Sequence, residues 1–191
     1  MPIKPQNLTM SSKTKNTIFD EFADELLKER SDRPLIIIGT SKVDNLLFEI
    51  LNLYFLPKRV KGNDSDELLE GDRPLATFSS RIKICYRLGI IDDTLCNSLE
   101  RLRTLRNPSA HSIAFDITKS PVKENIAELR KCVINRRSFQ LTQNRYFNKS
   151  NLNKTEELQC ILLTLCVLLE AIREKTSQTK GNKHSLQIAA R

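Results

Sequence analysis

The sequence predicts an all-α protein, a helical bundle of about six or seven helices. Glycine is scarce, with 5 among 191 residues, and the apolar runs are rich in leucine and isoleucine, which favours helix over sheet. Within these runs the apolar residues recur at intervals of three and four, as on the buried face of an amphipathic helix. A chain of this length can bury one sizeable core. We therefore expect one helical domain at 15–176, between disordered tails at 1–14 and 177–191.

The first two helices are predicted at 15–29 and 33–56. In the second, Pro34 suits the first turn and Pro57 stops the helix, because proline lacks the N–H that a helix interior needs. Gly39 lies inside this long apolar segment. Because glycine has no side chain, we expect a neighbouring helix to approach closely there.

Two further helices are predicted on either side of Gly89, which ends the first of them. Asp92 and Asp93 are suited to cap the second, which carries leucines at helical spacing as far as the start of "RNPSAH". In the first helix the face predicted to reach the core holds Phe78, Ile82, Cys85 and Tyr86, and the polar face holds Arg81, Lys83 and Arg87.

The C-terminal part is predicted to hold two helices, at 121–136 and 154–175, separated by a polar, irregular segment at 137–152. The last helix has the strongest pattern of the chain and is apolar on most of its faces. Together with residues 35–56 it offers more apolar surface than one small bundle readily covers. We therefore expect the protein to self-associate.

The overall charge and the cysteines restrict the class of protein. A formal net charge of +8 favours nucleic acid or an acidic protein as partner and does not choose between them. The five cysteines include no C-x-x-C pair, so we expect reduced thiols and no metal site. We also expect no small-molecule cofactor. No secretory signal is visible, and the longest apolar stretch is too short to span a bilayer. We expect a cytoplasmic protein without membrane contact.

The segment "LRTLRNPSAH" places Arg106, Asn107 and His111 close together. A metal-free ribonuclease needs an acid and a base, which histidine supplies near neutral pH, and a cation for the phosphate, which arginine supplies. The simpler interpretation is that Asn107 caps a new helix begun by Pro108, with Arg106 as a helix-end cation and His111 as a surface or packing residue. The physics of the sequence favours this second interpretation.

Residues 67–91 resemble the signature segment of the MltR family, the mannitol operon repressor group. The matching positions are Leu68, Leu69, Gly71, Pro74, Leu75, Ser79, Arg81, Lys83, Tyr86, Leu88, Gly89 and Ile91, or its neighbour Ile90. The resemblance implies an all-helical fold and a regulator of transcription that lacks an obvious DNA-reading element. It therefore implies a repressor-type regulator that acts mainly through protein contacts.

A narrower segment, "LRNPSAH", is similar to the Arg-x4-6-His motif of HEPN domains. That resemblance implies a metal-independent ribonuclease of a toxin–antitoxin or defence system, with Arg106 and His111 catalytic and Asn107 supporting. Pro108 departs from the motif, because it is expected to interrupt the helix that carries both residues. A third possibility is an immunity or antitoxin protein that occludes a toxin.

A basic group on the predicted helices is the remaining candidate site for a phosphate or a partner. An alternative for Arg81 is structural, a pair with Asp72 or Glu70 that fixes the preceding turn. A helix-turn-helix across Gly89 is disfavoured, because acids at the start of its second helix would face DNA phosphates. The candidate group comprises Ser79, Arg81, Lys83, Arg87 and Arg103.

Overall fold

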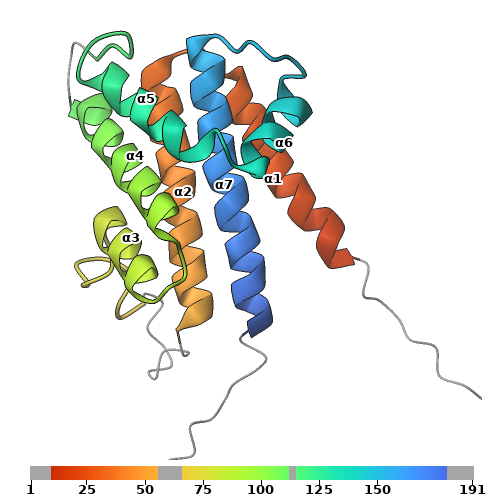
Figure 1. The fold of residues 1–191 in the computed structure, drawn as a ribbon. Helices are drawn as coiled ribbons and strands as arrows, with labels where there is room; N and C mark the ends of the chain where they lie inside the picture. The colour runs from red at the N-terminus through yellow and green to blue at the C-terminus, as the bar shows by residue number, and fades with distance from the viewer. Residues whose placement is uncertain (1–9, 56–65, 112–114, 180–191) are drawn as a thin grey trace, which may run out of the picture.

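The computed structural model describes residues 10–55, 66–111 and 115–179, and these residues form seven helices and no strand (Figure 1). The predicted all-α class is therefore confirmed. The helices are α1 (Met10–Lys28), α2 (Asp32–Tyr54), α3 (Phe78–Arg87), α4 (Asp93–His111), α5 (Val122–Val133), α6 (Arg137–Tyr146) and α7 (Lys154–Thr179).

The terminal helices are longer than predicted. Helix α1 begins at Met10, inside the segment expected to be a tail, and α7 continues to Thr179. The rest of the two predicted tails, residues 1–9 and 180–191, lies outside the described residues. None of the helices in the described part of the chain is long and apolar enough to cross a membrane.

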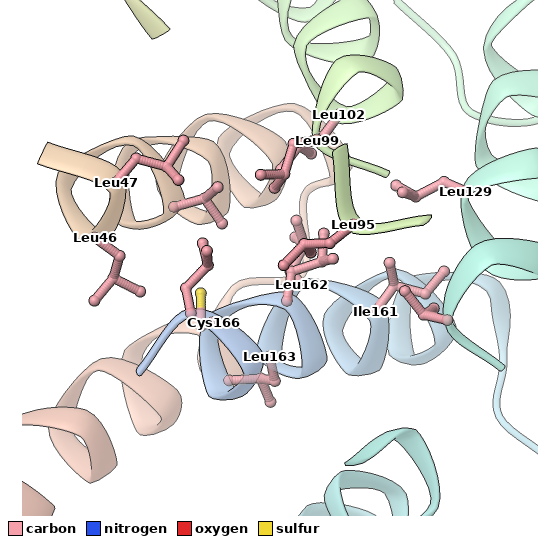
Figure 2. Close-up of a cluster of buried hydrophobic side chains, with 14 of the residues drawn as sticks. Leu46, Leu47, Leu95, Leu99, Leu102, Leu129, Ile161, Leu162, Leu163 and Cys166 are labelled. Atoms are coloured by element: carbon pink, nitrogen blue, oxygen red, sulfur yellow. The ribbon is translucent and has the colours of Figure 1, made fainter. Parts of the chain in front are cut away.

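Helix α7 runs through the middle of the bundle, beside α2 and covered by α1, α5 and α6 (Figure 1). Every residue from 158 to 166 is buried. Figure 2 shows Leu162 and Cys166 of α7 in one cluster of buried hydrophobic side chains with Leu47 of α2 and Leu95 of α4. The apolar surface that predicted self-association is thus largely covered within one chain, and self-association stays a prediction.

Helices α2 and α7 make the most extensive contact of the fold, and Gly39 lies within it. A β-carbon at Gly39 would lie 2.7 Å from Cδ1 of Leu162, closer than carbon atoms approach without strain. The expectation that Gly39 admits a close helix neighbour is therefore confirmed.

Helix α6 corrects the prediction of an irregular segment at 137–152. Its buried residues are Phe139 and Thr142, three positions apart, and it packs on α7 through this narrow stripe. Leu141, between them, is 58% exposed. With so few apolar residues among polar ones, the helical period was not apparent in the sequence.

Candidate functional site

Most residues singled out in the sequence lie on the hairpin formed by α3 and α4, which pack against each other. The start of α3 is a capping box, in which Thr77 Oγ1 accepts from the Ser80 N–H and Ser80 Oγ accepts from the Thr77 N–H. The start of α4 is capped by Asp92, whose carboxylate accepts from the Leu95 N–H at 2.7 Å. Local sequence therefore fixes where both helices begin.

The turn between the two helices depends on Gly89. Its φ of +68° lies in the left-handed region, which side chains other than glycine rarely adopt. The Ile90 N–H donates to the Cys85 carbonyl and the Gly89 N–H to the Tyr86 carbonyl, each at 2.9 Å. These two bonds are the Schellman motif that closes a helix C-terminus, so the predicted role of Gly89 is confirmed.

Arg81 lies inside the protein, where the prediction had it on the polar face of its helix. Only 9% of the residue is exposed. Its guanidinium donates to the carbonyls of Leu69 at 2.8 Å and Leu75 at 3.1 Å, and to Asp44 Oδ1 of α2 at 2.7 Å. It also lies over the ring of Phe48, 5.2 Å from its centroid. Arg81 therefore links the segment before α3 to α2, through its hydrogen bonds to the Leu69 and Leu75 carbonyls and its ion pair with Asp44.

These contacts correct the sequence analysis in two respects. The structural alternative for Arg81 named Asp72 or Glu70, neighbours along the chain, whereas the observed partner is Asp44 of α2. Tyr86 was expected in the core, and the structure leaves 41% of it exposed. Its helix packs with Ile82 and Cys85 inward, so Tyr86 lies at the border of that buried face.

The other candidate cations remain on the surface. Lys83 and Arg87 are exposed, four residues apart along α3, and Ser79 is half-buried one turn earlier. Within the described residues, neither Lys83 nor Arg87 takes part in an ion pair. Arg103 on α4 is engaged with Glu100, at 2.7 Å. Lys83 and Arg87 are therefore the candidates that present charge to a partner.

A groove of about 740 Å³ lies between the Gly89 turn and the C-terminal part of α7. Tyr86 is one of the residues that line it, and Leu88, in the same turn, is 36% exposed. Aromatic and aliphatic side chains with nearby arginines are typical of protein–protein contact surfaces. We call it the turn groove; its apolar residues include Ile90, Leu168, Ala171 and Ile172, and its charged residues are Arg87, Asp92, Asp93, Arg136 and Lys175.

The two acids of the turn groove are engaged by groups of the protein itself. Asp92 caps α4 and accepts from Arg136 at 3.1 Å. Asp93 accepts a hydrogen bond from the Tyr86 hydroxyl, which raises the pKa of Tyr86 above its ordinary value. Three cations, Arg87, Arg136 and Lys175, line the groove against these two carboxylates, which leaves one positive charge in excess. This charge suits an acidic partner.

Sequence reasoning missed the half of the turn groove that α7 and Arg136 supply. Leu168 and Ile172 belong to the pattern of a buried helix and are half-buried here. Their place beside Tyr86 is a long-range feature of the bundle. The one local signal was the return of charged residues near the end of the helix, at Glu170, Arg173, Glu174 and Lys175.

Helix α4 continues through Pro108 and ends at His111, so the expectation that Pro108 interrupts or begins a helix is wrong. Arg106 and Asn107 are exposed, and the buried Ser109 donates to the Arg106 carbonyl at 2.7 Å. Arg106 and His111 thus share one helix. The described residues do not include the side chain of His111, so the catalytic pair stays a prediction.

The cysteines lie in or beside the core. Burial raises the pKa of the Cys85, Cys160 and Cys166 thiols to about 12, so they are protonated and unreactive near neutral pH. Cys96 and Cys132 are half-buried, and all five thiols are free. Over the described residues, no group of three or more His, Cys, Asp or Glu side chains is placed to hold a metal ion.

Comparison with known proteins places the fold. No family model matches the chain, and no curated protein matches it in sequence. A possible transcriptional regulator, YggD from Shigella flexneri, shares the fold with a TM-score of 0.59 at 12% identity, over 81% of this chain and 98% of that one. MtlR of Escherichia coli, solved as a complex with HPr, gives a TM-score of 0.57 at 18% identity, over 82% and 99%. These likenesses are consistent with the fold implied by the MltR resemblance.

Proposed function

We propose that this protein is a cytoplasmic regulator of MltR type, which modulates transcription by binding a protein partner. The observation that carries the proposal is the fold shared with MtlR, a protein solved in complex with HPr, over 82% of this chain. The second structural neighbour is described as a possible transcriptional regulator. The segment at 67–91 that resembles the MltR signature builds the α3 half of the hairpin in this fold.

The turn groove is the surface that we assign to the partner. It combines exposed Tyr86 with apolar residues of α7 and two cations, Arg87 and Lys175, that have no carboxylate partner within the described residues, and exposed Leu88 lies next to it in the turn. Such a surface fits a partner that presents apolar side chains surrounded by acidic ones. The segment that resembles the MltR signature includes this turn, since Tyr86, Leu88 and Gly89 are among its matching positions.

Direct reading of DNA by this hairpin is less favourable. The second helix of a helix-turn-helix inserts its N-terminal residues into the major groove, and here those positions hold the exposed Asp92 and Asp93. Carboxylates at that end would be repelled by the phosphates. Any contact with nucleic acid would therefore use the basic surface without base recognition.

Calorimetric titration of the purified protein with HPr tests the proposal. We expect saturable binding in the micromolar range or tighter. The control is a mobility-shift series on unrelated DNA sequences at increasing salt, where a basic surface alone gives retention that falls steeply with salt. No measurable heat with HPr at about 100 µM, together with salt-resistant, sequence-dependent DNA retention, would replace the partner-binding proposal with a DNA-reading one.

A further inference from the structure

The C-terminal half of α7 is less covered by the bundle than the middle of the helix. Every residue from 158 to 166 is buried, whereas Val167, Leu168 and Ile172 are half-buried and Ala171 is exposed. In Figure 1, α5 and α6 lie across the N-terminal half of α7, and its C-terminal half extends beyond them. We call the surface formed by Val167, Leu168, Ala171 and Ile172 the α7 face.

The α7 face lies between two grooves of opposite charge. One is the turn groove, and the other, of about 250 Å³, lies between α7 and α1. Ala171 lines both, so the two grooves adjoin along the helix. The second groove, which we call the α1 groove, contains three carboxylates and two guanidinium groups, so one negative charge is in excess. These groups belong to Asp20, Glu170, Glu174, Arg145 and Arg173.

The turn groove has the opposite balance, with three cations against two carboxylates. On α7 itself the two signs are neighbours in sequence, since Glu174 lines the α1 groove and Lys175 lines the turn groove. Both side chains are exposed. The α7 face therefore has a basic flank on one side and an acidic flank on the other. A partner that suits it presents the same two signs in the reverse order.

A second copy of this chain presents that order when the two copies are related by a two-fold axis parallel to α7. This rotation places the basic flank of each copy opposite the acidic flank of the other, as in an isologous interface. Lys175 of each copy then faces Glu174 of the other, so the favourable pairing occurs twice. A two-fold axis across α7, in the plane of the contact, would instead place like charges opposite each other.

We propose that the α7 face binds a second copy of this chain in this parallel two-fold arrangement. Its apolar residues lie only between 167 and 172, so the dimer is weak and exchanges with the monomer. The second copy covers the turn groove and excludes the partner assigned to it. This exclusion rests on the proposed function, whereas the contact between copies does not.

Sedimentation velocity of the full chain tests the contact at protein concentrations from about 5 to 500 µM, a range that suits weak association. We expect the sedimentation coefficient to rise with concentration, and to rise less at high salt. Lys175→Glu and Glu174→Lys should each weaken dimerisation about tenfold, because each places like charges at both contacts. An equimolar mixture of the two variants should dimerise about as well as wild type, because each copy then carries the charge that the other needs.

The matched control is Lys154→Glu, at the exposed start of α7. It changes the net charge as much as Lys175→Glu does and should leave dimerisation unchanged. All three substituted side chains are exposed, and circular dichroism checks that the variants fold. The proposal is overturned if wild type stays monomeric over the whole range, or if Lys154→Glu weakens dimerisation as much as Lys175→Glu. It is also overturned if the mixture dimerises no better than either variant, or far more tightly than wild type, which would indicate like flanks opposed.

Sedimentation with added HPr tests the exclusion separately. We expect HPr to lower the fraction of dimer as it binds. HPr that binds without changing dimerisation would overturn the exclusion and leave the contact between copies intact. If HPr does not bind at all, the proposed function fails, and the results for the charge variants still decide the contact.

Discussion

Gly39 of α2 and Leu162 of α7 are in contact in a way that leaves no room for a β-carbon between the two helices. An added β-carbon would lie 2.7 and 2.8 Å from the two methyl carbons of Leu162 and 3.1 Å from its Cγ. Leu162 is completely buried, so it can move only at the expense of its neighbours. This contact sets the distance between the two central helices.

We therefore expect Gly39→Ala to destabilise the protein although alanine is the better helix former. The propensity gain is about 1 kcal/mol, and the overpacking cost about 1–3 kcal/mol, so the net loss should be about 1 kcal/mol. In a Leu162→Ala background the clash disappears, and the same substitution should stabilise by up to about 1 kcal/mol. Urea unfolding followed by circular dichroism measures both values. If Gly39→Ala changed the free energy of unfolding equally in the wild-type and Leu162→Ala backgrounds, the close contact between the two residues would be excluded.

The second stability prediction concerns the Arg81–Asp44 pair. Arg81→Ala removes three hydrogen bonds and leaves two carbonyls without their donor, so we expect a loss of about 2–4 kcal/mol. Arg81→Lys should recover only part of it, since an ammonium cannot match the planar fork. Lys83→Ala, two residues away and exposed, should stay within about 0.5 kcal/mol of wild type. Similar unfolding midpoints for the two alanine variants would exclude this role.

The role of Arg81 also shows where sequence reasoning reaches its limit. Periodicity identified the long helices, and the capping residues located the α3–α4 turn, because these features depend on neighbours along the chain. The partner of Arg81 comes from α2, 37 residues earlier, and nothing local specifies it. A short-range pair was the natural expectation and was wrong.

Pro108 and α6 illustrate two other limits of prediction from the sequence. Proline usually breaks a helix, yet α4 continues past Pro108 to His111, with Ser109 buried in the following turn. Tertiary packing here overrides a strong local preference. Helix α6 had the opposite difficulty, since its buried stripe is narrow and the rest is polar. The long-range assembly of the turn groove from α3 and α7 was equally invisible.

The cysteines give a prediction about chemical reactivity. At most two thiols, the half-buried Cys96 and Cys132, should react with a disulfide reagent in the folded protein at pH 8. The buried three should stay unreactive even at pH 9, since a pKa of about 12 leaves about a thousandth of each as thiolate. Five should react in denaturant. Rapid modification of four or more native thiols would show that the core opens readily.

The ribonuclease alternative and the regulatory proposal predict different results for RNA cleavage. Positions 106 and 111 are about 140° apart around an ideal helix, a spacing that does not favour joint action of the two side chains from one copy of a helix. We expect no RNA cleavage in EDTA, and no difference between wild type and His111→Ala. Gel analysis with a control nuclease measures this. Cleavage that survives EDTA and disappears in His111→Ala would support the enzyme and contradict our proposal.

The turn groove provides the last prediction, which concerns binding of HPr. Tyr86→Ala should weaken it tenfold or more, because an exposed aromatic side chain in a contact surface commonly supplies much of the affinity. Arg87→Glu should weaken it too, and the difference from wild type should shrink as salt is raised, since exposed charges are screened. Both residues are exposed, so neither change should alter the unfolding midpoint appreciably.

Leu141→Ala is the control for this prediction. Leu141 is the most exposed of the large apolar residues in the described part of the chain, at 58%, and lies on α6, away from α3 in the bundle (Figure 1). If the affinity depended on exposed apolar surface in general, Leu141→Ala would weaken binding as much as Tyr86→Ala. Binding that is lost only in the groove variants would assign the partner to the α3–α4 turn. Full affinity in Tyr86→Ala and Arg87→Glu, with HPr still bound, would retain partner binding and exclude this groove.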